Sequence, residues 1–301
     1  MSKRKPPSEQ SELVLSPTTA RVIQLSAEIQ ATPPDEIEFM HTVLCQVGLP
    51  RKRTKETRFE RNNGKASLLI TAGEMFNDGH WEKLFVPYGT KPRLAPFHIS
   101  TEAIRTKSRI VAVGRTISEF MKRLNISQNG PSREAFRAQM NALCACEMKL
   151  GYGSRNLNAR PVDEFDAWPK NLAKDSTIEL SDKFWQDLKE TAVPLDPRAL
   201  EVFFNYSLSI EIYTWLAHRL HRVRRPGEKL TWANLRLQFG QEYTDDKNFK
   251  KAFLIALRQV AAVYPDARLE QVRTGLRLIA SPPPVPRQTI IAYQKTIGSD
   301  T

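Results

Sequence analysis

Cysteine and long apolar runs are scarce in this sequence. It contains three cysteines, and an odd number argues against a disulfide framework, so we expect reduced thiols. No apolar run approaches the length of about 20 residues that spans a bilayer. The first ten residues, MSKRKPPSEQ, also lack the apolar core of a signal peptide. We therefore expect a cytoplasmic protein with no membrane partner.

Groups of catalytic or metal-binding side chains at suitable spacing are also missing. His41, His80 and His98 are isolated in the sequence, whereas a rolling-circle nickase needs closely spaced metal-binding histidines. His218 and His221 fall within one helical turn, but no third ligand stands at a suitable spacing. A phosphate-binding G-x-x-x-x-G-K-[ST] loop is absent as well. The sequence therefore predicts no enzyme activity, no metal and no cofactor.

Positive charge, by contrast, is abundant. Lysine and arginine number 45 against 33 aspartates and glutamates, which gives a net charge of +12. Such a balance favours a polyanionic partner, and nucleic acid is the first candidate. The length of 301 residues suggests about two domains, at roughly 150 residues each.

The segment from Thr231 to Ala280 has the pattern of a winged helix. Thr231 is a suitable N-cap for a short helix that Gly240 ends. A longer helix opens at Asp246, and its apolar stripe recurs at helical spacing through Phe249, Phe253, Leu257 and Val260. Two alternating segments then flank Thr274-Gly275, which predicts a hairpin. Helix, turn, helix and hairpin in this order are typical of a winged helix.

The longer helix carries its polar and basic side chains away from the apolar stripe. We expect this face to enter the DNA major groove and to contact DNA through Lys247, Asn248, Lys250, Lys251 and Arg258. The hairpin adds cations suited to the phosphate backbone, namely Arg268, Arg273 and Arg277. For any single run of charge, a solvated basic surface is the alternative interpretation.

The first half of the chain repeats this order of elements. We expect a helix over 92–106, a strand over 110–113, a short helix over 116–124 and a longer helix over 132–146. Residues 148–152, paired with 177–180 across a long polar loop, would form the wing. Cations that could make accessory DNA contacts here are Arg105, Lys107, Arg109, Arg133 and Arg137.

These patterns predict an α+β fold that is predominantly helical and has two tandem winged-helix domains. Residues 1–31 would be a flexible basic tail, because they contain too few apolar residues to order alone. The first domain would span 32–190 and open with an amphipathic helix over 32–49. The second domain would span 191–285, and residues 286–301 would form a C-terminal tail without a packing pattern.

Several short segments make the sequence similar to a known family. They are PYG at 87–89, KPRL at 91–94, STEAIRTKSR at 100–109, IYTWLAHRL at 212–220, Trp232 with QFG at 238–240, and VYPDA at 263–267. With these segments, the chain from about Pro87 to Pro284 resembles the plasmid-encoded RepA replication initiators of bacteria. The first 30 and the last 15 residues lie outside this resemblance.

The resemblance implies an initiator that binds repeated sites, called iterons, in the duplex DNA of a plasmid origin. It further implies opening of that origin and recruitment of the host helicase or of host initiator proteins. The second winged helix would read the repeats, and the first would serve dimerisation and further DNA contacts. A homodimer in equilibrium with a monomer is expected, with apolar surface offered by residues 32–49 and by a strand over 66–71.

Two alternatives use the same basic helices. A transcriptional repressor with two winged helices would bind DNA without initiating replication. A nickase or primase with an unrecognised site is a more remote alternative. Strand breaks or primer synthesis on supercoiled origin DNA would favour an enzyme, and local melting without a strand break would favour an initiator.

Overall fold

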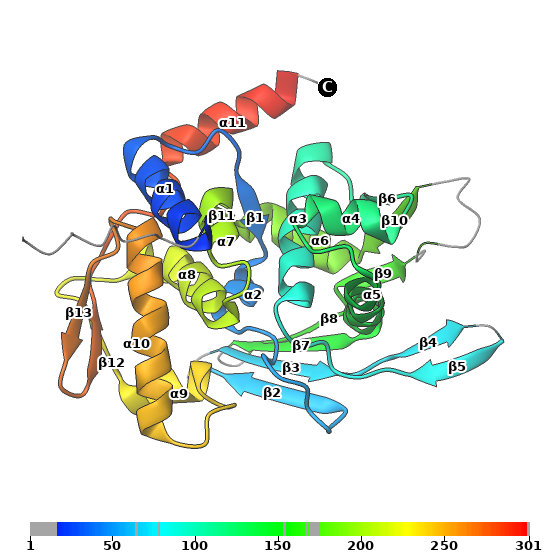
Figure 1. Ribbon diagram of the computed structural model, residues 1–301, viewed down its shortest axis with the longest axis horizontal. Coiled ribbons are helices and arrows are strands. Elements are labelled where there is room, and N and C mark those ends of the chain that lie inside the picture. The colour runs from blue at the N-terminus through cyan, green and yellow to red at the C-terminus, as the bar shows by residue number, and fades with distance from the viewer. Residues whose placement is uncertain are drawn as a thin grey trace, which may run out of the picture.

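The computed structural model describes residues 17–63, 66–77, 79–152, 155–165, 168 and 175–299 (Figure 1). It contains more helix than strand, and it confirms the predicted α+β class. The clearest unit lies in the C-terminal half. It consists of α8 (Ser207–Arg219), β12 (Glu228–Thr231), α9 (Trp232–Phe239), α10 (Asp246–Val263), β13 (Leu269–Val272) and β14 (Gly275–Leu278). The strands pair in the order β12-β14-β13, so this unit is the predicted winged helix.

Local sequence explains each boundary of this winged helix. The Thr231 hydroxyl accepts a hydrogen bond from the amide of Asn234 and caps α9. The Asp245 carboxylate accepts one from the amide of Asn248 and caps α10. At the tight end of the wing, Gly275 is required, because a Cβ there would lie 1.8 Å from the Leu230 carbonyl oxygen.

The first half contains a unit with the same order of elements. It consists of α3 (Lys91–Thr106), β6 (Ile110–Gly114), α4 (Ile117–Arg123), α5 (Gly130–Ala145), β9 (Val162–Phe165) and β10 (Ser176–Leu180). Its strands pair in the order β6-β10-β9, which matches β12-β14-β13 element for element. The predicted second winged helix is therefore present, and the helices and the first strand lie where the sequence placed them.

The prediction that residues 148–152 form the first strand of this wing was wrong. β7 (Glu147–Tyr152) does not pair with β10. It pairs instead with β3 (Ala66–Thr71) on one side and β8 (Arg155–Ala159) on the other, in a four-stranded sheet with the order β2-β3-β7-β8, where β2 is Arg58–Asn62. The wing is built by β9 and β10. Alternation of apolar and polar residues identifies a strand but not its partner, because any edge of matching pattern can pair with it.

The predicted helix over 32–49 was also wrong. This segment contains the strand β1 (Glu38–Met40) and the short helix α2 (Thr42–Gln46). β1 pairs antiparallel with β11 (Val193–Leu195), and the amide of Phe39 donates to the Thr101 hydroxyl at 2.8 Å. These long-range hydrogen bonds override the helical spacing of the apolar residues.

Both predicted tails contain helices. The first, α1 (Pro17–Ala31), packs against α10 and α7 (Pro197–Val202), whereas residues 1–16 of the predicted tail lie outside the described residues. The other, α11 (Arg287–Ser299), places Ile290 and Tyr293 on a small apolar cluster around Phe39. Two shorter elements complete this part of the chain: α6 (Asp182–Thr191), which Ser181 caps, and the 3-10 turn η1 (Leu220–Arg222).

The two winged helices share one core. A single cluster of buried apolar side chains runs through both halves, from Phe120 and Phe136 in the first to Phe249 and Phe253 in the second. Leu68 and Ile70 of β3 are fully buried within it. The face of strand 66–71 that carries Leu68 and Ile70 is therefore occupied by the protein's own core, and Leu69, on the other face, is the one large apolar side chain of this strand that is partly exposed.

A buried ionic cluster also joins the halves. Glu211 of α8 accepts hydrogen bonds from three guanidinium groups, at 2.5 Å from Arg51, 2.9 Å from Arg61 and 2.6 Å from Arg93. Glu242 binds Arg51 and Arg61 as well, at 2.6 and 2.8 Å. The arginines come from the first half and the carboxylates from the second. Charged groups this deeply buried are tolerated because each of them is paired with opposite charge and makes several hydrogen bonds.

One element projects from this body. β4 (Glu74–Asn77) and β5 (His80–Lys83) form a two-stranded hairpin that extends away from the rest of the molecule (Figure 1). Among the described residues, no helix is long and apolar enough to cross a membrane.

Candidate nucleic-acid interface

The outer face of α10 is the best exposed basic surface of the second winged helix. Phe249, Phe253 and Val260 are buried against α8 and α9, and the helical period turns Lys247, Lys251 and Arg258 to the opposite face, where all three are exposed. The ion pairs found among the described residues include none of these three cations. Their charges are therefore available to phosphates or base edges.

The other two predicted residues of α10 are partly committed to the protein. The Lys250 ammonium lies 4.8 Å from the centre of the Trp232 ring, a cation-π distance. The Asn248 side-chain amide donates to the Asp245 carboxylate at 2.5 Å. This hydrogen-bonded cap also lowers the pKa of Asp245, because the backbone amide of Asn248 stabilises the ionised form. Asn248 thus secures the start of the helix, and Lys250 stays near its flank.

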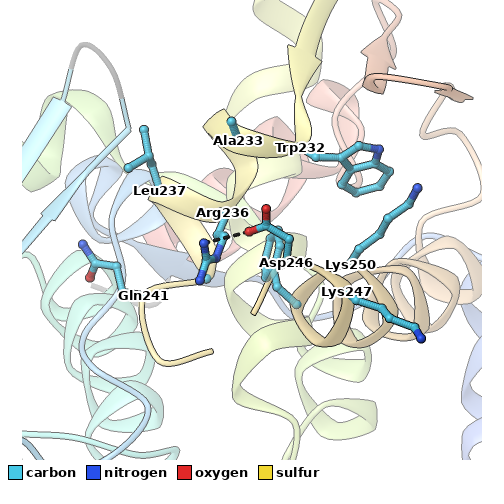
Figure 2. Close-up of a pocket in the computed structure, with 10 residues that line it drawn as sticks. Trp232, Ala233, Arg236, Leu237, Gln241, Asp246, Lys247 and Lys250 are labelled. Atoms are coloured by element: carbon cyan, nitrogen blue, oxygen red, sulfur yellow. Dashed lines mark ion pairs between the residues drawn. The ribbon is translucent and has the colours of Figure 1, made fainter. Parts of the chain in front are cut away.

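A groove of about 790 Å³ lies between α9 and the first turn of α10 (Figure 2). Leu237 and Gln241 line one side of it, and Lys247 and Lys250 line the other. Arg236 closes its floor through an ion pair with Asp246 at 2.7 Å.

Sequence analysis did not single out the α9 residues of this groove. The sequence nevertheless contains one indication of it. Leu237 lies off the apolar stripe formed by Leu235 and Phe239, which places an apolar residue on the solvent face of α9. Its exposed fraction is 62%.

The wing cations differ from one another in the structure. Arg268 and Arg273 are exposed at the two ends of β13. Arg277 instead donates to the carbonyl oxygen of Pro226 at 2.8 Å and pairs with Glu270 at 3.3 Å. Arg268 and Arg273 are therefore the wing cations available to a phosphate, with Arg273 at the tip of the wing, and Arg277 has a structural role within the sheet.

The cations predicted in the first half are mostly paired. Arg105 binds Glu102 at 2.6 Å, and Arg109 binds Asp163 at 3.5 Å and also Glu179. Lys107 ends α3 in the left-handed conformation, with a φ of 54°.

On α5, Arg133 is exposed and Arg137 lies 5.8 Å from the centre of the Trp168 ring. The structure does not bring the first-half cations into one continuous free surface like that of α10.

The two histidines considered for metal binding, His218 and His221, lie in a partly buried site beside Arg222. Burial and the neighbouring Arg222 lower the pKa of His218 to about 3, so its ring is neutral near pH 7. His221 has a lowered pKa for the same reasons, and its Nδ1 lies 3.1 Å from the Ala217 carbonyl oxygen. Within the part of the chain that the structure describes, no group of three or more His, Cys, Asp or Glu side chains could hold a metal ion.

Comparison with known proteins places part of this chain in a family. Two crystal structures of RctB are similar to this chain, both at 11% sequence identity. The structure of selenomethionine derivatives of domain 2 and domain 3 has a TM-score of 0.48, and the match covers 76% of this chain and 89% of the RctB chain. The structure of RctB domains 2–3 has a TM-score of 0.47, and the match covers 78% of this chain and 94% of the RctB chain. No curated protein matches the sequence. A family model described as plasmid encoded RepA protein matches residues 86–234. Over these residues, the chain belongs to the plasmid-encoded RepA protein family.

Proposed function

We propose that this protein initiates plasmid replication by binding repeated sites in the duplex DNA of its origin. The observation that carries the proposal is the outer face of α10, where Lys247, Lys251 and Arg258 stand exposed and unpaired on the longer helix of a complete winged helix. Family membership of residues 86–234 supports the same assignment. We propose that the protein acts in the cytoplasm through binding alone, without an enzyme activity, metal or cofactor of its own.

In this proposal, α10 lies in the major groove and the wing follows the adjacent backbone. A major groove admits one α-helix, and side chains on its exposed face reach base edges and phosphates. Lys251 and Arg258 lie two turns apart on that face, so they meet different base pairs or phosphates. Arg273 at the tip of the wing adds a phosphate contact.

Opening of the origin and recruitment of the host helicase or host initiator proteins belong to the same proposal. Binding free energy from several copies on adjacent repeats would supply the work of strand separation.

Self-association of the chain as a homodimer in equilibrium with a monomer would then limit the active form at high concentration. Such an equilibrium would contribute to plasmid copy control.

The test is footprinting and permanganate probing of the DNA upstream of the gene with the full chain. We expect protection of repeated sites and local melting in supercoiled DNA without a strand break. Protection without melting, in the presence of host initiator proteins, would favour a transcriptional repressor. Nicking or primer synthesis would instead show that the chain carries an enzyme activity.

A further inference from the structure

The projecting hairpin of β4 and β5 presents two large aromatic side chains to solvent. Phe76 is 60% exposed and Trp81 is 66% exposed. They stand directly opposite each other in the strand register, with ring centres 5.6 Å apart and planes inclined at 60°. Strand alternation places them on one face of the hairpin. Contiguous exposed aromatic surface of this kind marks an interaction site, because aromatic side chains dominate the energetics of buried interfaces.

The base of this hairpin is fixed to the first winged helix. The amide of Leu84 donates to the Gly73 carbonyl oxygen at 3.0 Å. Gly73 packs so closely on the end of α5 that a Cβ there would lie 1.9 Å from the Ala145 carbonyl oxygen. The backbone that carries the aromatic pair is therefore already ordered in the free protein. This reduces the conformational entropy that binding of a partner would cost.

The charges of the hairpin favour a protein partner over DNA. On the aromatic face, Glu74 stands opposite Lys83, and on the other face Glu82 pairs with His80 at 3.3 Å. The described strands thus carry two carboxylates and one lysine on a chain whose net charge is +12. A DNA-binding arm needs cations to neutralise phosphates. An aromatic and slightly acidic arm suits a partner surface that is apolar and basic.

This chain itself carries such a surface, the groove between α9 and α10. Its apolar lining includes Trp232, Ala233 and the exposed Leu237, and its rim carries Lys247 and Lys250 (Figure 2). The volume of about 790 Å³ leaves room for an aromatic pair. In Figure 1, α9 and α10 lie at the left and the β4–β5 hairpin projects at the right, away from them, so a chain cannot fill its own groove with its own hairpin.

We propose that the β4–β5 hairpin of one copy docks in the α9–α10 groove of a second copy, with Phe76 and Trp81 as the apolar anchors. Glu74 and Glu82 then approach Lys247 and Lys250. Because the contact joins two different surfaces, it gives a closed homodimer when each copy docks its hairpin in the groove of the other. It covers one end of α10, so the occupied groove is closed to DNA; this consequence, unlike the contact itself, rests on the proposed function.

Chemical cross-linking tests the geometry directly. The three native cysteines are buried, so thiol reagents will react with introduced ones. Lys83→Cys protein mixed with Ala233→Cys protein should form a cross-linked pair with a short bis-maleimide, in the absence of DNA. Neither variant should cross-link alone, and Ile110→Cys, exposed on β6, should not replace Lys83→Cys. Cross-linking of Lys83→Cys protein with itself would show a two-fold hairpin contact and overturn the proposal, as would no cross-link in the mixture.

Sedimentation of the full chain tests the anchors. Removing both rings by Phe76→Ala and Trp81→Ala should raise the dissociation constant for self-association at least about tenfold, as expected for hot-spot residues. Ile110→Ala is the matched control and should leave it unchanged. A wild-type chain that stays monomeric at every concentration overturns the proposal.

DNA binding by the same double variant separates the remaining outcomes. At dilutions where the wild type is monomeric, the variant should bind origin DNA as well as the wild type does, and at high concentration it should bind better. Weaker binding at every dilution would mean that the hairpin contacts DNA, for example by stacking on unpaired bases, and would overturn the proposal. Failure of both proteins to bind repeats would refute the proposed function and leave the cross-linking result standing.

Discussion

The two winged helices have the same topology but different surroundings. In the second, α10 presents a continuous exposed basic face, and its wing turns through only Arg273 and Thr274. In the first, β7 and β8 are inserted between α5 and the wing, and the projecting hairpin packs on the end of α5. Its cations are mostly engaged within the protein. One topology thus leaves a free basic helix in one half and carries added strands in the other.

The ionic cluster that joins the halves gives the largest expected effect. Glu211→Gln leaves Arg51 and Arg61 buried with Glu242 as their remaining carboxylate and leaves Arg93 buried with none, so the free energy of unfolding should fall by about 3–5 kcal/mol. The matched control is Glu201→Gln, which removes an exposed pair with Arg21 and should cost about 0–1 kcal/mol. Urea unfolding measures both. Equal small losses would mean that the cluster does not hold the halves together.

The same carboxylate predicts a pH dependence. Burial alone would raise the pKa of Glu211, but Arg51, Arg61 and Arg93 outweigh it and lower the pKa to about 2. A depressed pKa contributes stability above the unfolded value of about 4.3, and this stability is lost as pH falls through about 2. The contribution is on the order of 3 kcal/mol. Between about pH 5 and about pH 2, which spans the two pKa values, the free energy of unfolding of the wild type should therefore fall more steeply than that of Glu211→Gln. Urea unfolding at several pH values in this range measures the difference.

Substitutions in the two longer helices compare their roles on DNA. Lys251→Ala or Arg258→Ala on α10 should weaken origin binding by about 1–3 kcal/mol if the side chain reads a base edge, and should relax the preference at one position. An equal loss on every sequence would identify a phosphate contact instead. Arg137→Ala on α5 and Lys183→Ala, exposed on α6, should have smaller effects. If Arg137→Ala cost as much as Arg258→Ala, the first winged helix would read DNA as well.

The smallest expected effect is on the salt dependence of DNA affinity, which compares two arginines of the same wing. Each neutralised phosphate contributes a slope of about −0.9 in log K against log salt. Arg273→Ala should flatten the slope by about one contact, because this residue is free at the tip of the wing. Arg277→Ala should change it less, since Arg277 is held by Glu270 and Pro226. The reverse order would mean that Arg277 leaves its internal partners on DNA.

Local sequence patterns predicted the positions of most helices and strands, but they did not predict which distant segments contact each other. The cap at Thr231 and the stripe through Phe249 and Phe253 are set by neighbouring residues, so the sequence located α9 and α10. The partner of β7 and the strand β1 depend on residues far away in the chain, and a one-sequence pattern carries no pairing information.

The candidate interface divides in the same way. The exposed cations of α10 follow from helical period alone. Sequence could not reveal that Arg277 is engaged, or that Arg51, Arg61 and Arg93 converge on Glu211, because each depends on tertiary packing.

The pairing of the first strand with a late one has a consequence for synthesis on the ribosome. β1 pairs with β11, and α1 packs on α7 and α10, with Arg21 bound to Glu201 and Gln30 near Ala262. The start of the chain must therefore wait until about residue 263 has emerged before its contacts can form. Contacts of such long sequence separation slow folding. A nascent chain would expose apolar surface of α1 and β1 for most of its translation, and a fragment of residues 191–285 would lack these partners altogether.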